Sequence, residues 1–337
     1  MLCRGGFYKK TNGGNKKMIT NKEFDFLPAA WLPSNDPEML DRVRNIKRED
    51  MEYTNEYGYS VKVVLDPTLI VAQDIFHRIY LSDVLDQHFT AIFPNQWPAL
   101  YSAVAEMINK YNVNCRNVDL FAMDEWADQD GNVAPLTYGA GLGHGFRKYF
   151  YGRIREDLRP DVEHWHVFTN ENKGTDVYSS MIEEIGQGGA DVIYSATGWT
   201  GHSAYIDPNV EEFKADSLEE FCKLGSRLTT LNHITICQNS LGMSMGGSGD
   251  IWNIPPRAAT IGPRDIVNAR ERVELHNFVG AGGDSWQRMI SRIELYGPIS
   301  KECPASILRL GKGTCYVSEA IAKPFRVRTN DMKQWEL

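Results

Sequence analysis

The most informative segment of this chain spans residues 190–208 and reads ADVIYSATGWTGHSAYIDP. Its first five residues form a short apolar run that predicts a buried strand. A glycine-containing loop follows and presents His202, with the carboxylate of Asp207 five residues further on. In an open α/β sheet, the loops at the carboxyl ends of the strands carry the chemistry. We therefore expect His202 to transfer protons at one edge of such a sheet.

A second segment upstream, residues 118–126, is built in the same way and reads VDLFAMDEW. It predicts an apolar strand that ends in two acids, Asp124 and Glu125. Two strands that deliver acid and base groups from their carboxyl ends predict one shared cleft. The structural alternative is that these acids cap the next element, that His202 is a hydrogen-bonded loop residue, and that Asp207 only starts a turn.

Strands and helices alternate along most of the chain. We expect strands at residues 61–65, 90–93, 117–123, 164–168, 190–194, 234–237, 258–261 and 273–278, and helices at 67–85, 98–111, 137–156, 175–185, 263–270 and 285–295. Regular alternation predicts an α/β fold with a mostly parallel sheet and helices on both faces, which is a Rossmann-like three-layer arrangement.

The 337 residues suit one large α/β domain with short additions at its ends. We expect residues 59–327 to form this domain and residues 328–337 to be a C-terminal tail. Residues 1–58 are interpreted as an N-terminal extension, disordered over 1–17, with a short helix near 37–43. No apolar core follows the first lysines, so these residues do not resemble a signal peptide, and Met1 and Met18 are both candidate starts.

Composition narrows the classes of partner. The net charge of −8 argues against a nucleic-acid partner, and no apolar run approaches the ~20 residues of a membrane span. The six cysteines lack metal or redox-motif spacing, which indicates reduced thiols in a cytoplasmic protein. His164 and His166 share one face of a strand, but no further ligand lies near them in the sequence, so we predict no metal site.

Three segments resemble the glucosamine-6-phosphate deaminases (isomerases). Residues 121–126 look like the family's Met-Asp-Glu-Tyr segment, and residues 198–208 resemble its Gly-x-Asp-Gly-His-x-Ala-Phe-x-Glu-Pro loop. Residues 258–270 are similar to its Thr-x-Gly strand and the helix that follows. The resemblance covers roughly residues 61–327 and implies the family's fold, and the related 6-phosphogluconolactonases share the Gly-His loop.

The resemblance implies aldose–ketose isomerisation with deamination of an amino sugar, without a cofactor. Asp124 would move a proton between C1 and C2, and His202 would open the sugar ring. Asp207 stands where the family has a glutamate that steers the histidine. Aspartate is one methylene shorter, so a water or a backbone shift would have to cover the gap.

Three anion contacts of the family are missing here. Its Gly-rich phosphate turn corresponds to residues 93–98, FPNQWP, its arginine to Leu241, and its last lysine has no counterpart in residues 280–285. In the first of these places Asn95, Gln96 and Trp97 offer amides and an indole, which suit neutral hydroxyls and a sugar face. We interpret the ligand as an unphosphorylated or differently substituted sugar. The alternative for Trp97 is plain core packing.

Other positions complete the expected substrate-binding set. Thr200 replaces a family aspartate, and its hydroxyl cannot hold a negative charge. Gly201 belongs to the same loop, and Glu125 follows the expected base. His144 lies in the glycine-rich segment 139–145, which in the family supplies a mobile wall of the site.

Arg257 and Arg264 flank the strand at 258–261 and are candidate replacements for the missing cation. Surface salt bridges are the alternative for both arginines.

Three functions stay open from the sequence. The first is an amino-sugar isomerase/deaminase, the second a sugar lactonase that uses His202 as a base on water, and the third a non-catalytic sugar sensor. We favour the enzyme of the first kind. We expect it to act in the cytoplasm on a sugar or sugar phosphate, to work without membrane or nucleic acid, and to be able to form a homo-oligomer.

Overall fold

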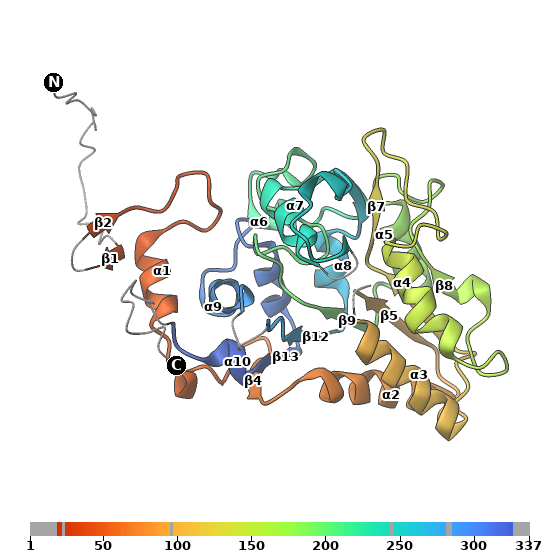
Figure 1. Cartoon of the computed structure of the whole chain (residues 1–337). Helices are drawn as coiled ribbons and strands as arrows, with labels where there is room; N and C mark the ends of the chain where they lie inside the picture. The colour runs from red at the N-terminus through yellow and green to blue at the C-terminus, as the bar shows by residue number, and fades with distance from the viewer. Residues whose placement is uncertain (1–18, 22–23, 95–96, 243–244, 281–284, 326–337) are drawn as a thin grey trace.

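The computed structural model describes residues 19–21, 24–94, 97–242, 245–280 and 285–325. Its centre is an eight-stranded sheet in the order β3-β4-β13-β12-β9-β5-β6-β8 (Figure 1). The strands are β3 (Tyr53–Thr54), β4 (Tyr59–Val64), β5 (Phe89–Phe93), β6 (Val118–Ala122), β8 (Trp165–His166), β9 (Val192–Ser195), β12 (Glu271–His276) and β13 (Gly313–Ser318). Only the β3–β4 pair of this sheet is antiparallel. The expected mostly parallel α/β sheet is confirmed.

Helices cover both faces of this sheet and complete three layers. One face packs on α2 (Thr68–Val84), α3 (Pro98–Tyr111) and α4 (Leu142–Tyr149). The other face packs on α5 (Val177–Ile185), α8 (Pro263–Asn268), α9 (Gln287–Tyr296) and α10 (Glu319–Ala322). Strand β5 shows the division, because Ala91 and Phe93 enter the first core and Ile92 enters the second.

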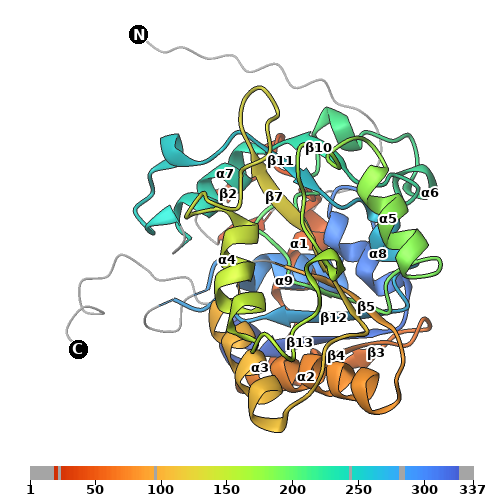
Figure 2. The same ribbon diagram turned by 90° about the vertical axis from the view of Figure 1, so that its right-hand side faces the viewer.

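A smaller antiparallel sheet stands above the large one (Figure 2). It has the order β10-β11-β7, with β7 (Asp124–Ala127), β10 (Arg227–Thr230) and β11 (Arg257–Thr260). Only Met123 separates β6 of the large sheet from β7 of the small one. Asp124 therefore lies where the two sheets meet, opposite Thr260 of β11.

Several expected elements differ from the structure. The strand expected at residues 234–237 is wrong, because they belong to helix α7 (His233–Ser240), which the Asn232 side chain caps by accepting a hydrogen bond from the Ile234 amide. The strand expected at 258–261 exists as β11 but belongs to the small sheet. Strand β13 is absent from the sequence-based prediction. Helix α4 is shorter than expected and begins only at Leu142.

Two elements before β4 pack on the main body. Helix α1 (Pro37–Arg44) contacts α9 through a small apolar cluster, and β3 extends the edge of the large sheet. Strands β1 (Ile19–Asn21) and β2 (Phe24–Phe26) form a separate pair. The predictions for residues 1–17, for the start at Met1 or Met18 and for the tail 328–337 lie outside the described residues.

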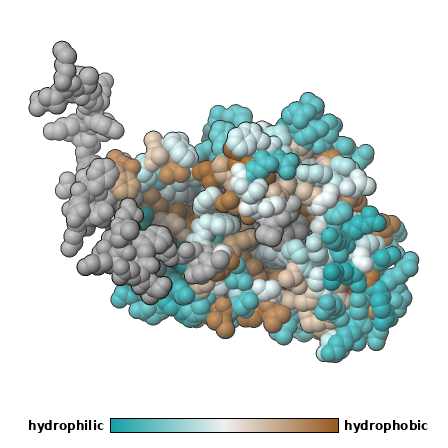
Figure 3. Space-filling view, in the orientation of Figure 1, coloured by the Kyte–Doolittle hydropathy of each residue, from teal (hydrophilic) through white to brown (hydrophobic). Residues whose placement is uncertain are grey.

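Among the described residues, no helix combines the length and the apolar character that crossing a bilayer requires. Hydrophilic side chains cover much of the surface in Figure 3, most densely at the right, where α3 and β8 lie in Figure 1.

Candidate active site

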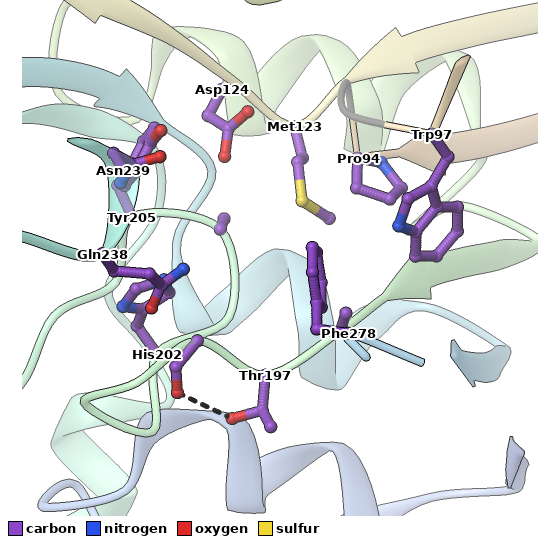
Figure 4. Close-up of a pocket in the computed structure, with 13 residues that line it drawn as sticks. Pro94, Trp97, Met123, Asp124, Thr197, His202, Tyr205, Gln238, Asn239 and Phe278 are labelled. Atoms are coloured by element: carbon purple, nitrogen blue, oxygen red, sulfur yellow. Dashed lines mark hydrogen bonds between the residues drawn. The ribbon is translucent and has the colours of Figure 1, made fainter. Parts of the chain in front are cut away.

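One cavity of about 80 Å³ lies at the carboxyl ends of β6 and β9, below the start of β7. Its wall combines acid–base, amide and aromatic side chains. The lining residues are Pro94, Trp97, Met123, Asp124, Ala196, Thr197, Gly198, His202, Ala204, Tyr205, Gln238, Asn239 and Phe278 (Figure 4).

Asp124 and His202 both line this cavity, so the two strand-end segments meet in space. In Figure 4 they lie to the left, and Trp97 and Phe278 lie to the right. Asp124 and His202 are largely buried, with 7% and 5% of their surface exposed. Burial, and after it the Asp124 charge, raises the pKa of the neighbouring Tyr205 well above its ordinary value.

The fully buried carboxylate of Asp207 lies next to Nδ1 of the His202 ring. His202 Nδ1 lies 3.1 Å from Asp207 Oδ1, so no water is needed to span the shorter aspartate side chain. The hydroxyls of Thr200 and Thr235 donate to the same oxygen at 2.8 and 2.7 Å. The other oxygen, Oδ2, accepts from the Asn232 amide at 2.9 Å.

This bonding selects a tautomer of the histidine. Each threonine hydroxyl has one proton, and both are directed at Asp207. The Nδ1–H group of His202 is then a donor to Thr200 Oγ1 at 2.7 Å and to Asp207 Oδ1 at 3.1 Å, so in the neutral ring Nε2 is the basic nitrogen. This nitrogen is the one that can exchange a proton with a ligand.

Gly198 makes room for the histidine. A Cβ atom at this position would lie 1.9 Å from His202 Nε2, which is far inside any contact distance. The glycine is thus required for the ring to lie where it does. The Gly198 amide also donates to the His202 carbonyl at 2.9 Å, which closes the loop around the ring.

Gly201 and Thr200 belong to the loop that carries His202 and are not among the residues that line the cavity. Gly201 adopts a φ of +82°, and a Cβ there would lie 2.7 Å from Cys303 Sγ. Its backbone amide closes a turn onto Gly198. Thr200 acts through Asp207 and His202 and is not among the residues that line the cavity.

Glu125 and His144 make contacts outside the cavity and are not among its lining residues. The Glu125 carboxylate accepts from the amides of Leu142 and Gly143 at 2.9 and 2.7 Å and so caps α4. Burial raises the pKa of Glu125, and these backbone bonds oppose the shift. His144 Nδ1 contacts the Leu136 carbonyl, and no residue of 139–145 lines the cavity.

Trp97 lies between the cavity and the apolar core. It lines the cavity, and its indole ring also packs on Tyr101 at a centroid distance of 6.4 Å. Asn95 and Gln96 lie outside the described residues. The two candidate cations pair with acids instead of lining the cavity, with Arg264 Nε 3.1 Å from Glu183 and Arg257 3.8 Å from Glu212.

Sequence reasoning missed several residues of the site. Gln238 and Asn239 line the cavity from α7, and Phe278 lines it from beyond β12. Thr235, also from α7, supports the Asp207 carboxylate. A strand at 234–237 would separate these side chains, whereas the capping signal of Asn232 before a helix would have placed them together.

Comparison with known proteins gives related sequences at low identity. No family model matches the chain. The chain is 25% identical to the glucosamine-6-phosphate deaminase of Clostridium acetobutylicum over 229 residues, which are 66% of this chain and 81% of the relative. It is 22% identical to the enzyme of that name from Pseudoalteromonas translucida over 223 residues, 65% and 71% of the two chains.

Solved structures share the fold over nearly their whole length. A monomeric glucosamine-6-phosphate deaminase superposes with a TM-score of 0.59 at 17% identity, over 78% of this chain and 98% of that one. The 6-phosphogluconolactonase of Trypanosoma cruzi gives 0.54 at 14% identity, over 80% and 98%. Sequence matches and shared fold agree: the chain is similar in sequence to glucosamine-6-phosphate deaminases, and it has the fold that solved deaminases and 6-phosphogluconolactonases share.

Proposed function

We propose that this protein isomerises and deaminates an amino sugar that carries no phosphate. One observation supports the proposal most: Asp124 and His202 line a single cavity in whose described wall there is no lysine or arginine. The proposal has two parts, the reaction and the lack of a phosphate on the substrate, and each part can be tested separately.

Ring opening is the task of His202. In the neutral ring, Nε2 accepts the proton of the anomeric hydroxyl and delivers a proton to the ring oxygen as the C1–O5 bond breaks. The Asp207 carboxylate, with its two threonine donors and the Asn232 amide, stabilises the transient imidazolium. Thr200 thus assists through the carboxylate that it contacts.

Proton transfer between carbons is the task of Asp124. Its carboxylate takes the proton from C2 of the open amino sugar and returns it to C1, while O1 gains a proton and the amino nitrogen loses one, which leaves an imine at C2. Water then adds to this imine and ammonia leaves, so that a ketose remains.

The other lining residues of the cavity suit an uncharged sugar. Trp97 and Phe278 offer flat apolar faces, and the Gln238 and Asn239 amides offer donors and acceptors for hydroxyls. A phosphate dianion in the same place would need a cation or a cradle of amides to replace its hydration. The two candidate arginines, 264 and 257, are committed to acids on other elements.

The test is solvent exchange in D₂O followed by NMR, with 2-amino-2-deoxyhexoses and their 6-phosphates as substrates. We expect deuterium at C1 of the product, release of ammonia, and a kcat/KM at least ~10-fold higher for the neutral sugar, or ~1.4 kcal/mol. Asp124→Asn should reduce exchange by roughly 10²- to 10⁴-fold. Asp130→Asn, in the exposed turn after β7, is the matched control and should retain full activity.

A lactonase is the second candidate, because the His202–Asp207 pair is complete without Asp124 and could activate water. Hydrolysis of a sugar lactone that survives Asp124→Asn, without any carbon exchange, would favour it. Sugar binding without turnover of either kind would indicate a sensor. Preference for the 6-phosphate with exchange intact would contradict only the substrate half of the proposal.

A further inference from the structure

A second group of reactive side chains lies in the core between the large sheet and α9. Glu274 and His276 leave the same face of β12, and Cys315 is the register partner of Glu274 on β13. Glu294 comes from α9, the helix that covers this face. All four side chains are completely buried, with no exposed surface. Such a set is unusual in a core that is otherwise apolar.

The distances between the His276 ring and the two carboxylates are longer than those of good hydrogen bonds, although the groups lie close together. His276 Nε2 lies 3.4 Å from Glu274 Oε2 and 3.4 Å from Glu294 Oε2. Neither ring nitrogen of His276 makes a hydrogen bond to the described part of the chain, nor does Glu274 Oε2 or either Glu294 oxygen. Ligand atoms of Glu274, His276 and Cys315 all lie within 4.8 Å of one another.

This spacing matches the coordination shell of a tetrahedral ion. Two ligand atoms that each lie ~2.1 Å from a tetrahedral zinc ion are separated by roughly 3.4 Å. A direct N–H···O hydrogen bond would bring the same atoms to about 2.9 Å. The two distances from the imidazole nitrogen to the carboxylate oxygens therefore fit ligands of one metal ion better than direct hydrogen bonds.

Charge leads to the same conclusion. Within the described residues, the only ion-pair partner of Glu274 and of Glu294 is His276, and the other Glu274 oxygen accepts from the neutral Tyr59 hydroxyl. The nearby Arg309 guanidinium donates to backbone carbonyls instead. A divalent ion would allow both carboxylates to be ionised, which without a cation costs several kcal/mol for each charge in a dry core.

We propose that Glu274, His276, Glu294 and Cys315 bind one zinc ion in the core beneath α9. One nitrogen, one sulfur and two carboxylate oxygens form a donor set that zinc accepts in tetrahedral geometry. The Cys315 thiol releases its proton to solvent as the sulfur–metal bond forms. The prediction of no metal from the sequence rested on spacing along the chain, and these ligands come from three separate elements.

The ion would support the active site without touching the sugar. It would tie α9 to β12, and α9 holds the floor of the cavity because Gln287 Nε2 donates to the Thr197 carbonyl at 2.9 Å. Thr197 itself lines the cavity. The site is therefore structural, and it does not depend on which reaction the cavity performs.

The experiment measures metal content and ligand chemistry in the full-length protein. Elemental analysis of the purified chain should find about one zinc ion per chain. After exchange with Co²⁺ alone, the absorption spectrum should show tetrahedral cobalt bands and a thiolate-to-cobalt charge-transfer band. Cys315→Ser should remove the charge-transfer band and weaken binding by at least the ~10- to 100-fold that loss of an outer-shell partner costs.

Cys115→Ser is the matched control, because Cys115 is also a buried thiol but belongs to the core on the other face of the sheet. It should leave both the zinc content and the cobalt spectrum unchanged. If Cys315→Ser does not fold, X-ray absorption of the wild-type zinc protein still reports whether one sulfur ligand is present. A folded wild-type protein that binds neither zinc nor cobalt would overturn the proposal, as would an ion without a sulfur ligand.

Discussion

Gly198 and His202 define the active position of the imidazole at the scale of single residues. The ring lies directly over the glycine, and the geometry leaves no space for a methyl group, since a Cβ atom there would come within 1.9 Å of Nε2. The position of the His202 ring thus depends on the glycine at residue 198. A sequence match to the loop shows that both residues are present but does not show this contact.

Gly198→Ala should therefore lower turnover strongly while the fold persists. The new methyl group has to displace the ring, and a displacement of about 1 Å can cost roughly 10²-fold in rate. Steady-state kinetics with circular dichroism as the check of folding measures both. Gly139→Ala is the matched control, because nothing lies within 4 Å of a Cβ there. Full activity in Gly198→Ala would mean that His202 does not act from this position.

Thr200 and Thr235 share one acceptor, and their effects on catalysis should be coupled. Each Thr→Val change removes a donor to Asp207 Oδ1 and should lower kcat by roughly 10-fold with little change in KM, since a bond to a charged group contributes ~1.5–3 kcal/mol. The double variant should deviate from additivity by at least ~0.5 kcal/mol. Additive effects would show that the threonines do not act through one carboxylate.

At the residue scale, Asp124, His202 and Asp207 were predicted from the sequence because ligand chemistry in an open α/β sheet lies at the carboxyl ends of the strands. Asp124 follows β6, and His202 and Asp207 lie in the loop after β9. The same argument does not separate Asp124 from Glu125. Asp124 lines the cavity, whereas the Glu125 carboxylate accepts hydrogen bonds from amides of α4. Adjacent residues of a strand leave opposite faces, so a pair of acids cannot both serve one site. That alternation was available in the sequence.

At the scale of elements, Asp119 joins three neighbouring strands of the large sheet. It lies on β6 and contacts His166 of β8 at 2.6 Å, His88 before β5 at 2.7 Å, and His164 at 3.1 Å. Burial raises the pKa of Asp119, but the hydrogen bonds from these histidines outweigh it and hold the pKa at about 2. Asp119 lies near the amino end of β6, whereas the cavity lies at the carboxyl end.

This depressed pKa makes the edge of the sheet sensitive to acid. Because the pKa is lower in the folded state than the ordinary 3.8, Asp119 stabilises the fold above about pH 4, and this contribution is lost as the pH falls towards 2. Asp119→Asn should lower the free energy of unfolding by roughly 2 kcal/mol at neutral pH. The difference from wild type should shrink below pH 4 in urea titrations.

The exposed Asp216 provides the control for this experiment, and Asp216→Asn should leave the unfolding curve in place at every pH. A deficit in Asp119→Asn that stays constant from pH 7 to pH 2 would contradict the assignment. It would indicate lost packing in place of a lost charge.

The elements that sequence reasoning misassigned share a cause, which is that distant or capping contacts decide them. Residues 234–237 carry two isoleucines and a threonine, which favour a strand, yet one capping side chain at Asn232 decides for a helix. Residues 258–261 do form a strand, but a local pattern cannot say which sheet it joins. Strand β13 reads GTCYVS, and its glycine and small polar residues give only a weak strand signal.

At the scale of the whole molecule, both the net charge and the described lining of the cavity disfavour an anionic ligand. The net charge of −8 repels anions, and the described wall of the cavity offers no lysine or arginine to recover them. A cavity of about 80 Å³ is also small, since pockets that enclose drug-sized ligands measure ~300–1,000 Å³. A sugar has to move some lining side chains as it enters.

Binding of an uncharged substrate should therefore be insensitive to salt. Between ~0.01 M and ~1 M ionic strength the Debye length falls from ~30 Å to ~3 Å, yet KM for the preferred sugar should change by less than about 2-fold. Initial rates at each salt concentration measure this, with thermal unfolding as the control for stability. A KM that rises steeply with salt would indicate an anionic substrate and a cation outside the described wall.

The position of β13 has a consequence for how the protein is made. This strand comes near the end of the chain but lies between β4, one of the first strands, and β12. During synthesis β4 and β12 are made before β13, the strand that pairs with both. The edges of β4 and β12 that face β13 therefore stay unpaired until residue 318 has been translated. A chain that stops before β13 should aggregate, because the edges of β4 and β12 stay unpaired.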